Sequence, residues 1–193
     1  MYKLVAIDLD GTLLNNEKEI SREDKNSIQR AASKGLSFVI VTGRSYYSAK
    51  CIASQLGLDM HIISNNGAIL RFSKNDDEII SKHMKQEDLD DLLKFSFDMN
   101  LEPTIHVNYF RNGIDLITSF ENPRKDYIMS YEDRYLFIEK KDMNSIKKTL
   151  SLVYIDDKIK INHFYEQLKR TYGKKFSYHL LENLRIGGTM LEV

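Results

Sequence analysis

The sequence predicts an α/β fold, with part of a doubly wound parallel-sheet core followed by an inserted α+β cap domain. Short apolar runs at residues 4–7, 38–42 and 60–64 alternate with amphipathic segments of helical period, which is typical of strands and helices that take turns along a chain. Each of these runs ends in polar residues. After residue 67 the pattern changes to hairpin-like pairs and further helices, which indicates a second domain.

The first part of the chain is expected to hold three strands and two helices. Leu4 to Ile7 is an apolar run bounded by turn residues, which predicts a strand buried on both faces of a parallel sheet. Ser21-Arg22-Glu23-Asp24 resembles a capping box, and it opens a helix that ends near Gly35. Ser45 is expected to cap a second helix, whose apolar positions fall on one face up to about Gly57.

The second part is expected to be an α+β insert with helices covering one sheet face. We divide the chain into a core segment at 1–81, a cap at 82–186 and the start of a return to the core at 187–193. The expected elements are a hairpin at 68–72 and 78–82, a helix at 86–100, a hairpin at 104–110 and 114–119 around Asn112-Gly113, a strand at 135–138, a short helix at 142–148, a strand at 149–155, a helix at 156–172, and a closing antiparallel pair at 176–181 and 184–193.

The composition of the chain argues against several classes of function. The 193 residues carry 28 basic and 28 acidic side chains, so no broad basic field attracts nucleic acid or an anionic membrane. No apolar run approaches the roughly 18 residues of a membrane-spanning helix. The single cysteine fits a reducing compartment. A cytoplasmic protein that binds neither nucleic acid nor membrane is therefore expected.

Two carboxylates, Asp8 and Asp10, directly follow the first predicted strand, and Gly11 and Thr12 come next. Ligands of parallel sheets bind at the carboxyl ends of the strands, and residues i and i+2 of a strand point the same way. Two carboxylates held this close repel each other unless a cation or a proton lies between them, and Mg²⁺ suits such oxygen ligands. The first can then act as a nucleophile and the second as an acid and base. The alternative is a polar turn after a strand.

The next two strands also end in candidate site residues. The Thr42 hydroxyl and nearby backbone N–H groups, with Gly43 allowing close approach, can hold a phosphate oxygen. Arg44 can pair with a substrate anion, or it can be a solvated surface arginine. Asn66, which precedes Gly67, can contact substrate. The alternatives are that Thr42 only caps the next helix and that Asn66 is only a turn residue.

These segments resemble the haloacid dehalogenase superfamily of phosphohydrolases, and more narrowly its Cof-type branch with a large class II cap. The residues that carry the resemblance are Asp8-Leu9-Asp10-Gly11-Thr12-Leu13-Leu14, Thr42-Gly43-Arg44 and Ser64-Asn65-Asn66-Gly67-Ala68. The first motif is highly specific for the superfamily. The other two are specific for the branch in combination.

The resemblance implies a phosphatase of small phosphorylated metabolites. Asp8 would attack phosphorus and form an aspartyl-phosphate, while Asp10 would protonate the leaving oxygen and then help to activate water. Mg²⁺ would be held by Asp8 and the backbone carbonyl of Asp10, with the Asp10 side chain left free. Phosphate contacts fall to Leu9, Thr42 and Gly43, and substrate contacts fall to Arg44 and Asn66. The cap would close over the site and select the substrate.

The chain also departs from the family pattern. Family members continue beyond the cap with a phosphate-binding lysine and a Gly-Asp-x-x-Asn-Asp stretch that completes the metal site, and neither is found here. A C-terminally truncated core is therefore expected, and its open sheet edge would favour self-association. Two other readings follow, an inactive fragment that acts as a binding or interaction module, and a phosphotransferase or mutase on the same core.

Overall fold

The computed structural model describes residues 2–182 and 187–193, and the chain divides into two compact units. The first unit ends at Lys82 and the second begins at His83, one residue from the expected boundary. Each unit has its own sheet. None of the helices in these two stretches has both the length and the apolar character needed to cross a membrane.

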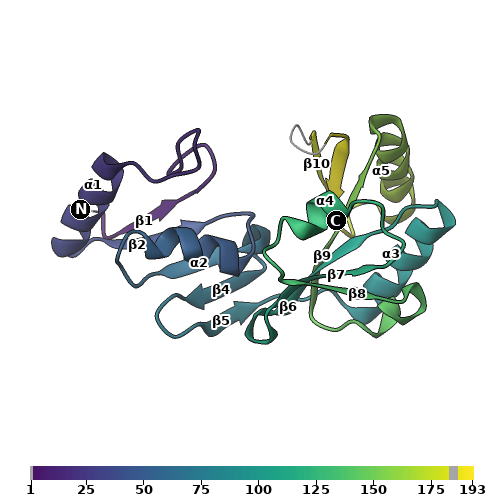
Figure 1. The fold of residues 1–193 in the computed structure, drawn as a ribbon, viewed down its shortest axis with the longest axis horizontal. Helices are drawn as coiled ribbons and strands as arrows, with labels where there is room; N and C mark the ends of the chain where they lie inside the picture. Colours follow the sequence, from purple (N-terminus) through teal and green to yellow (C-terminus); the bar gives the residue numbers. More distant parts are fainter. Residues whose placement is uncertain (1, 183–186) are drawn as a thin grey trace. The chain divides into compact units, whose positions relative to one another are not determined.

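The first unit is built on a five-stranded sheet in the order β1-β2-β3-β4-β5 (Figure 1). Strands β1 (Leu4–Ile7), β2 (Ser37–Val41) and β3 (His61–Ser64) are parallel, as the alternation of strands and helices predicted. The expected hairpin forms from β4 (Ile69–Phe72) and β5 (Asp77–Ser81), and it extends the same sheet in antiparallel fashion. The carboxyl ends of the three parallel strands therefore share one edge.

Helices α1 (Arg22–Ser33) and α2 (Tyr46–Ser54) begin at the predicted residues because each has a serine cap. The Ser21 hydroxyl accepts a hydrogen bond from the backbone N–H of Asp24 at 3.0 Å, and the Ser45 hydroxyl accepts one from Ser48 at 3.3 Å. These side chains satisfy backbone donors that a helix start leaves without partners. The second cap places the beginning of α2 directly after the Thr42–Arg44 segment.

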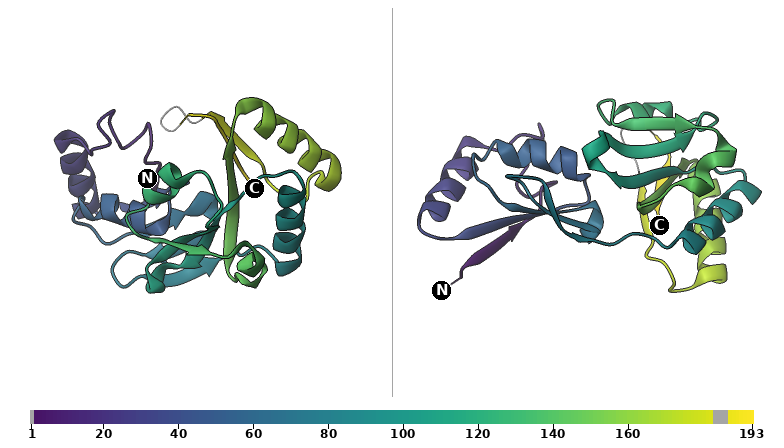
Figure 2. Two further views of the ribbon diagram at one scale, coloured as in Figure 1. Left: turned by 45° about the vertical axis from the view of Figure 1, so that its right-hand side comes forward. Right: turned by 90° about the horizontal axis from the view of Figure 1, so that it is seen from below.

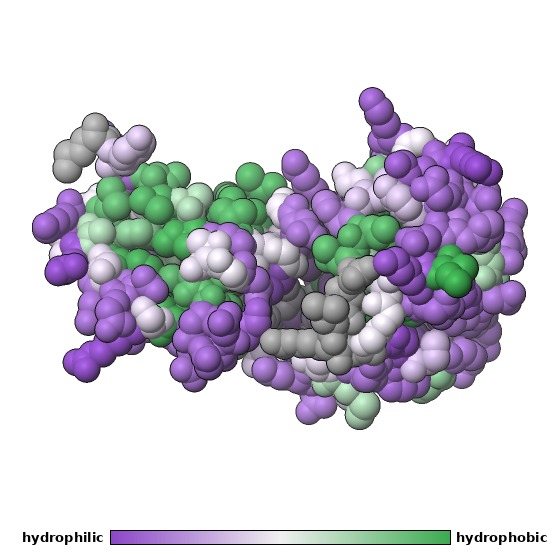
Figure 3. All heavy atoms as spheres, turned by 90° about the horizontal axis from the view of Figure 1, so that it is seen from above, coloured by the Kyte–Doolittle hydropathy of each residue, from purple (hydrophilic) through white to green (hydrophobic). Residues whose placement is uncertain are grey.

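The prediction that the first strand is buried on both faces is wrong. Among the residues that the structure describes, strand β1 lies at the edge of the sheet and pairs only with β2, and 60% of the Leu4 surface is exposed. An apolar run predicts a strand but does not state what packs over each of its faces, which is why the prediction of burial on both faces failed. Figure 3 shows hydrophobic side chains gathered on one face of this unit.

The second unit holds a six-stranded sheet in the order β10-β11-β9-β6-β7-β8. The antiparallel pair β6 (Thr104–Tyr109) and β7 (Ile114–Ser119) lies beside β8 (Tyr135–Ile138), which is parallel to β7. On the other side β6 pairs with β9 (Thr149–Asp156). The helices of this unit are α3 (Gln86–Asp98), α4 (Lys125–Met129) and α5 (Lys158–Tyr172). Its 3₁₀ turns are η2 (Phe110–Asn112) and η3 (Lys140–Ser145). The first unit has a 3₁₀ turn of its own, η1 (Asn65–Gly67). The sequence did not predict α4, and the short helix expected at 142–148 is the 3₁₀ turn η3.

Helices α3 and α5 cover one face of this sheet (Figure 2). Their buried side chains, Leu92 and Phe164 among them, form one apolar core with Ile105 and Val107 of β6. Because side chains alternate along a strand, the intervening His106 points to the opposite face. There its imidazole Nε2 lies 3.1 Å from the hydroxyl of Tyr127 on α4. The sheet therefore has one apolar face and one face that carries buried polar groups.

Residues 187–193 are expected to start a return to the core. For the strand that these residues form, this prediction is wrong. Strand β11 (Thr189–Glu192) lies inside the second sheet, between β10 (His179–Glu182) and β9. Leu191 is fully buried in the apolar core of that unit. Antiparallel pairing on both sides and this burial hold the segment in the second unit. The expected strand at 184–193 begins outside the described residues.

Candidate functional site

The expected acidic pair follows β1 on a tight turn. Leu9 is fully buried, whereas Asp8 and Asp10 on either side of it are exposed. The backbone N–H of Leu13 donates to the carbonyl of Asp8 at 3.2 Å, and that of Leu14 donates to the carbonyl of Leu9 at 2.9 Å. The buried leucine thus anchors the turn and leaves both carboxylates at the surface, at the carboxyl end of the strand.

The carboxylate of Asp10 is held by two cations. Arg44 donates to it through Nε at 2.7 Å and through one terminal nitrogen at 2.8 Å, and Lys18 Nζ donates to the same group at 2.8 Å. The hydrogen bonds from Arg44, followed by those from Lys18, outweigh partial burial and hold the pKa of Asp10 well below its usual range. Asp10 is therefore ionised in this arrangement.

The loop after β2 is fixed by its own side chains. Thr42 is buried, its backbone N–H donates to Ile63 at 2.9 Å, and its hydroxyl accepts a hydrogen bond from the backbone N–H of Arg44 at 3.2 Å. Because Ser45 caps α2, Thr42 is not the cap that the alternative reading required. Its hydroxyl orients the loop that carries Arg44, and the pairing of β1 with β2 places Thr42 at the same sheet edge as Asp8.

The loop after β3 packs directly against that one. The backbone N–H of Asn65 donates to the carbonyl of Arg44 at 2.9 Å. Asn66 has a left-handed backbone with φ 52°, and a Cβ added to Gly43 would lie 2.7 Å from its side-chain oxygen. Glycine at position 43 is therefore what lets the two loops approach. The structure brings Asp10, Thr42, Gly43, Arg44 and Asn66 into one cluster of loops.

The pairing of two expected site residues with each other was not foreseen. The Asp10 side chain, which is the expected acid and base, is paired with Arg44, which is an expected substrate contact. Lys18 was missed altogether. A signal for it exists in the sequence, because the polar residues 15–19 lie between Leu14 and Ile20, and a tight return of the chain there brings Lys18 back towards Asp10.

The donors at this turn suit a hard divalent cation. Mg²⁺ takes oxygen ligands and is commonly held by one or two carboxylates, with water and substrate phosphate completing its shell. Asp8 presents an exposed carboxylate two residues before the backbone carbonyl of Asp10. Within residues 2–182 and 187–193, no three His, Cys, Asp or Glu side chains gather as a metal site. The Asp8 carboxylate and the Asp10 carbonyl are oxygen donors of the kind that Mg²⁺ binds.

Similar proteins in the curated set are phosphatases. The chain is 43% identical over 68 residues to the phosphatase YwpJ of Bacillus subtilis, and the match covers 35% of this chain and 24% of that protein. It is 46% identical over 66 residues to the 5-amino-6-(5-phospho-D-ribitylamino)uracil phosphatase YcsE of the same organism, covering 34% of this chain and 26% of that one. These matches thus span about a quarter of the relatives' length.

Solved structures share the fold over nearly the whole chain. TM0651 from Thermotoga maritima superposes with a TM-score of 0.78 at 22% identity, covering 99% of this chain and 69% of that one. The subclass IIB sugar phosphatase BT4131 gives 0.67 at 16% identity, covering 99% and 69%. These likenesses confirm the expected fold class. The sequence model for haloacid dehalogenase-like hydrolases matches residues 5–193, so the resemblance carried by the Asp8–Leu14 motif is confirmed and the chain belongs to that family.

Proposed function

We propose that this chain carries the nucleophile of a Mg²⁺-dependent phosphatase that acts on small phosphorylated metabolites in the cytoplasm. The single observation that carries the proposal is the acidic pair at the carboxyl end of β1, beside the loop in which Arg44 holds Asp10. Membership of the hydrolase family and the phosphatase names of the relatives support it. We propose a small substrate rather than nucleic acid or a membrane because the chain has equal numbers of basic and acidic side chains.

Asp8 is the proposed nucleophile because its carboxylate is exposed at the turn. One of its oxygens attacks phosphorus and the bond from phosphorus to the leaving oxygen breaks, which gives an aspartyl-phosphate. Water then attacks that phosphorus, phosphate departs and the Asp8 carboxylate is restored. Bound Mg²⁺ would offset the negative charge on the transferring group.

Asp10 is the proposed acid and base. It gives a proton to the leaving oxygen in the first step and takes one from the attacking water in the second. As paired with Arg44 and Lys18 it is a carboxylate, which is the form that accepts a proton. To give a proton Asp10 must first take one up, which its ion pairs with Arg44 and Lys18 oppose. Backbone N–H groups near Leu9 and Gly43 and the Thr42 hydroxyl are the proposed phosphate contacts, and Asn66 is a proposed substrate contact.

The test is hydrolysis of an aryl phosphate by the purified chain with and without Mg²⁺, beside Asp8→Asn and the control Asp59→Asn. Asp59 is exposed in the same unit and lies outside the site loops. We expect Mg²⁺-dependent turnover that falls below about a tenth in Asp8→Asn and persists in the control. Residual activity above that level would contradict the assignment of the nucleophile.

Other outcomes of the same assay separate the remaining readings. Phosphate binding by a folded chain without turnover would favour a binding module. Transfer of the phosphoryl group to an added alcohol in preference to water would favour a phosphotransferase. Self-association through the open edge of β1 is a further proposal, and sedimentation of the purified chain would test it.

A further inference from the structure

Lys18 is a second cation at the acidic pair, and neither the sequence motifs nor the proposed mechanism gives it a role. Its Nζ lies 2.8 Å from Oδ1 of Asp10, the same oxygen to which Arg44 donates through its terminal nitrogen. Two cationic side chains from distant parts of the first unit thus converge on one carboxylate. That carboxylate stands two residues from the proposed nucleophile, Asp8.

The turn that carries Lys18 is built to return it to this place. Asn15 ties both ends of the turn, because its backbone N–H donates to the Glu19 carbonyl at 3.0 Å and its side-chain oxygen accepts from the Glu19 N–H at 2.9 Å. The Lys18 N–H donates back to the Asn15 carbonyl at 3.0 Å. Lys18 itself has φ 64°, a left-handed conformation in which glycine is favoured over lysine. The backbone of Lys18 in this conformation directs the side chain to Asp10, where the Nζ contact is made.

Lys18 and Arg44 hold Asp10 in different ways. Arg44 uses two nitrogens in a fork, a geometry that fixes both partners, and 29% of its side chain is exposed. Lys18 makes a single contact from a side chain that is 41% exposed. An ammonium has three N–H donors on a flexible stem, so Lys18 can keep one on Asp10 and offer another to a neighbouring anion. Arg44 is therefore the fixed partner of Asp10 and Lys18 the adaptable one.

We propose that Lys18 binds the phosphate group of the substrate, donating one N–H to a phosphoryl oxygen while Asp10 keeps another. This inference rests on the proposed function and names one of its substrate contacts. The charges support it, because Asp8 and Asp10 are balanced by Lys18 and Arg44. A bound Mg²⁺ would leave two positive charges, which match a phosphate monoester dianion. Without Lys18 the site would carry one positive charge fewer than is needed to balance the phosphate dianion.

The experiment measures binding of inorganic phosphate in the presence of Mg²⁺ by calorimetry, together with KM and kcat for an aryl phosphate. The variants are Lys18→Gln, Lys18→Met and Lys18→Arg, and the matched control is Lys34→Gln, an exposed lysine of the same unit after α1. Lys18→Gln and Lys18→Met are expected to weaken phosphate binding and raise KM about tenfold, with a smaller change in kcat. Lys18→Arg should recover most of the loss, since it keeps the charge, and Lys34→Gln should match the unchanged chain.

The outcomes separate this inference from the proposed function. If the unchanged chain binds or hydrolyses phosphate esters and Lys18→Gln does so equally well, Lys18 is only a surface ion-pair partner and the inference is overturned. If Lys18→Arg is as impaired as Lys18→Gln, the positive charge is not what matters and the inference is also overturned. If the unchanged chain neither binds phosphate nor turns over substrate, the proposed function fails, and this inference fails with it.

Discussion

Arg44 holds the carboxylate of Asp10 with two hydrogen bonds, 2.7 and 2.8 Å long, although 34 positions of sequence separate the two residues. The fork geometry fixes the carboxylate in both position and plane. Arg44 is itself fixed, because its backbone N–H donates to Thr42 and its carbonyl accepts from Asn65. The orientation of Asp10 is therefore set by loops that follow all three parallel strands.

This relationship predicts that Arg44→Lys affects catalysis more than stability. Lysine keeps the charge but donates from a single nitrogen, so it cannot hold both carboxylate oxygens in one plane. An exposed ion pair contributes at most about 1 kcal/mol to folding, whereas a misplaced catalytic group can lower a rate by about a hundredfold. Urea unfolding should thus change little, while kcat for an aryl phosphate should fall at least tenfold.

The control for this variant is Arg30→Lys, at an exposed position of α1 outside the site. It should leave both stability and kcat unchanged. A loss of several kcal/mol in Arg44→Lys, with kcat per folded molecule preserved, would show that the pair has a structural role instead.

In the second unit, burial of His106 predicts a dependence of stability on pH. Burial lowers the pKa of this imidazole below its ordinary value of 6.5, even though the charges of Glu192 and Asp115 act in the opposite direction. Because the folded state favours the neutral ring, unfolding takes up a proton when the pH lies between the folded pKa and about 6.5. The contribution of His106 is thus fully present above pH 6.5 and is lost as the pH falls through the folded pKa.

The measurement is urea unfolding at pH values from 7.5 down to 5 for the unchanged chain and for His106→Gln. The free energy of unfolding should fall by at most about 1.4 kcal/mol per pH unit below 6.5 through this residue. Glutamine carries no titrating proton, so the variant should lack this part of the slope. Parallel pH profiles for the two proteins would count against a neutral His106 in the fold.

Local signals in the sequence predict much of the fold because they report local physics. Ser21 and Ser45 mark helix starts through hydrogen bonds to residues three positions away. The Asn112-Gly113 dipeptide predicts its hairpin, since Gly113 adopts the left-handed conformation that the turn requires. What the sequence does not state is which elements pack over the faces of each strand and which strands pair with it. This is why the exposure of β1 and the place of β11 inside the second sheet were missed.

The residues of the candidate site likewise fall into those that the sequence predicts and those that it does not. Residues at strand ends, such as Asp10 and Thr42, can be located because parallel strands bring their carboxyl ends to one edge. The pairing of Arg44 with Asp10 and the approach of Lys18 depend on how two loops fold back, which the positions of the strand ends do not predict. The contact of Gly43 with Asn66 likewise becomes visible only when both loops are in place.

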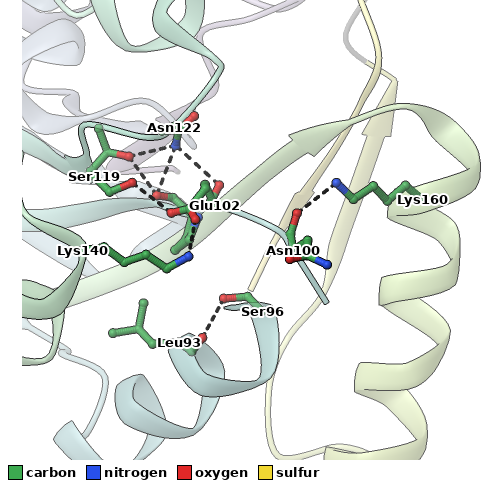
Figure 4. A network of polar contacts seen from close by, with 10 residues as sticks. Leu93, Ser96, Asn100, Glu102, Ser119, Asn122, Lys140 and Lys160 are labelled. Atoms are coloured by element: carbon green, nitrogen blue, oxygen red, sulfur yellow. Dashed lines mark hydrogen bonds and ion pairs between the residues drawn. The ribbon is translucent and has the colours of Figure 1, made fainter. Parts of the chain in front are cut away.

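Asn122 is a buried amide in the second unit, and we expect a small change of its side chain to destabilise that unit. Figure 4 shows its side chain among the residues that follow α3 and end β7. Only 1% of Asn122 is exposed, and its NH₂ group donates to Thr118 Oγ1 at 2.8 Å and to the Pro103 carbonyl at 3.2 Å. It also lies 3.2 Å from Thr104 Oγ1 and 3.4 Å from the Glu102 carbonyl.

Asn122→Asp keeps the shape of the side chain and replaces this donor with an oxygen. The Thr118 hydroxyl already donates to the Pro103 carbonyl, so the new carboxylate would face acceptors that it cannot satisfy. We expect a loss of about 3 kcal/mol in the free energy of unfolding of this unit at pH 7. Asn144→Asp, the same chemical change at an exposed position, should cost less than about 0.5 kcal/mol. Equal unfolding midpoints for the two variants would mean that the Asn122 network does not stabilise the unit, whereas partial recovery of Asn122→Asp at pH 4 would identify the buried charge as the cause.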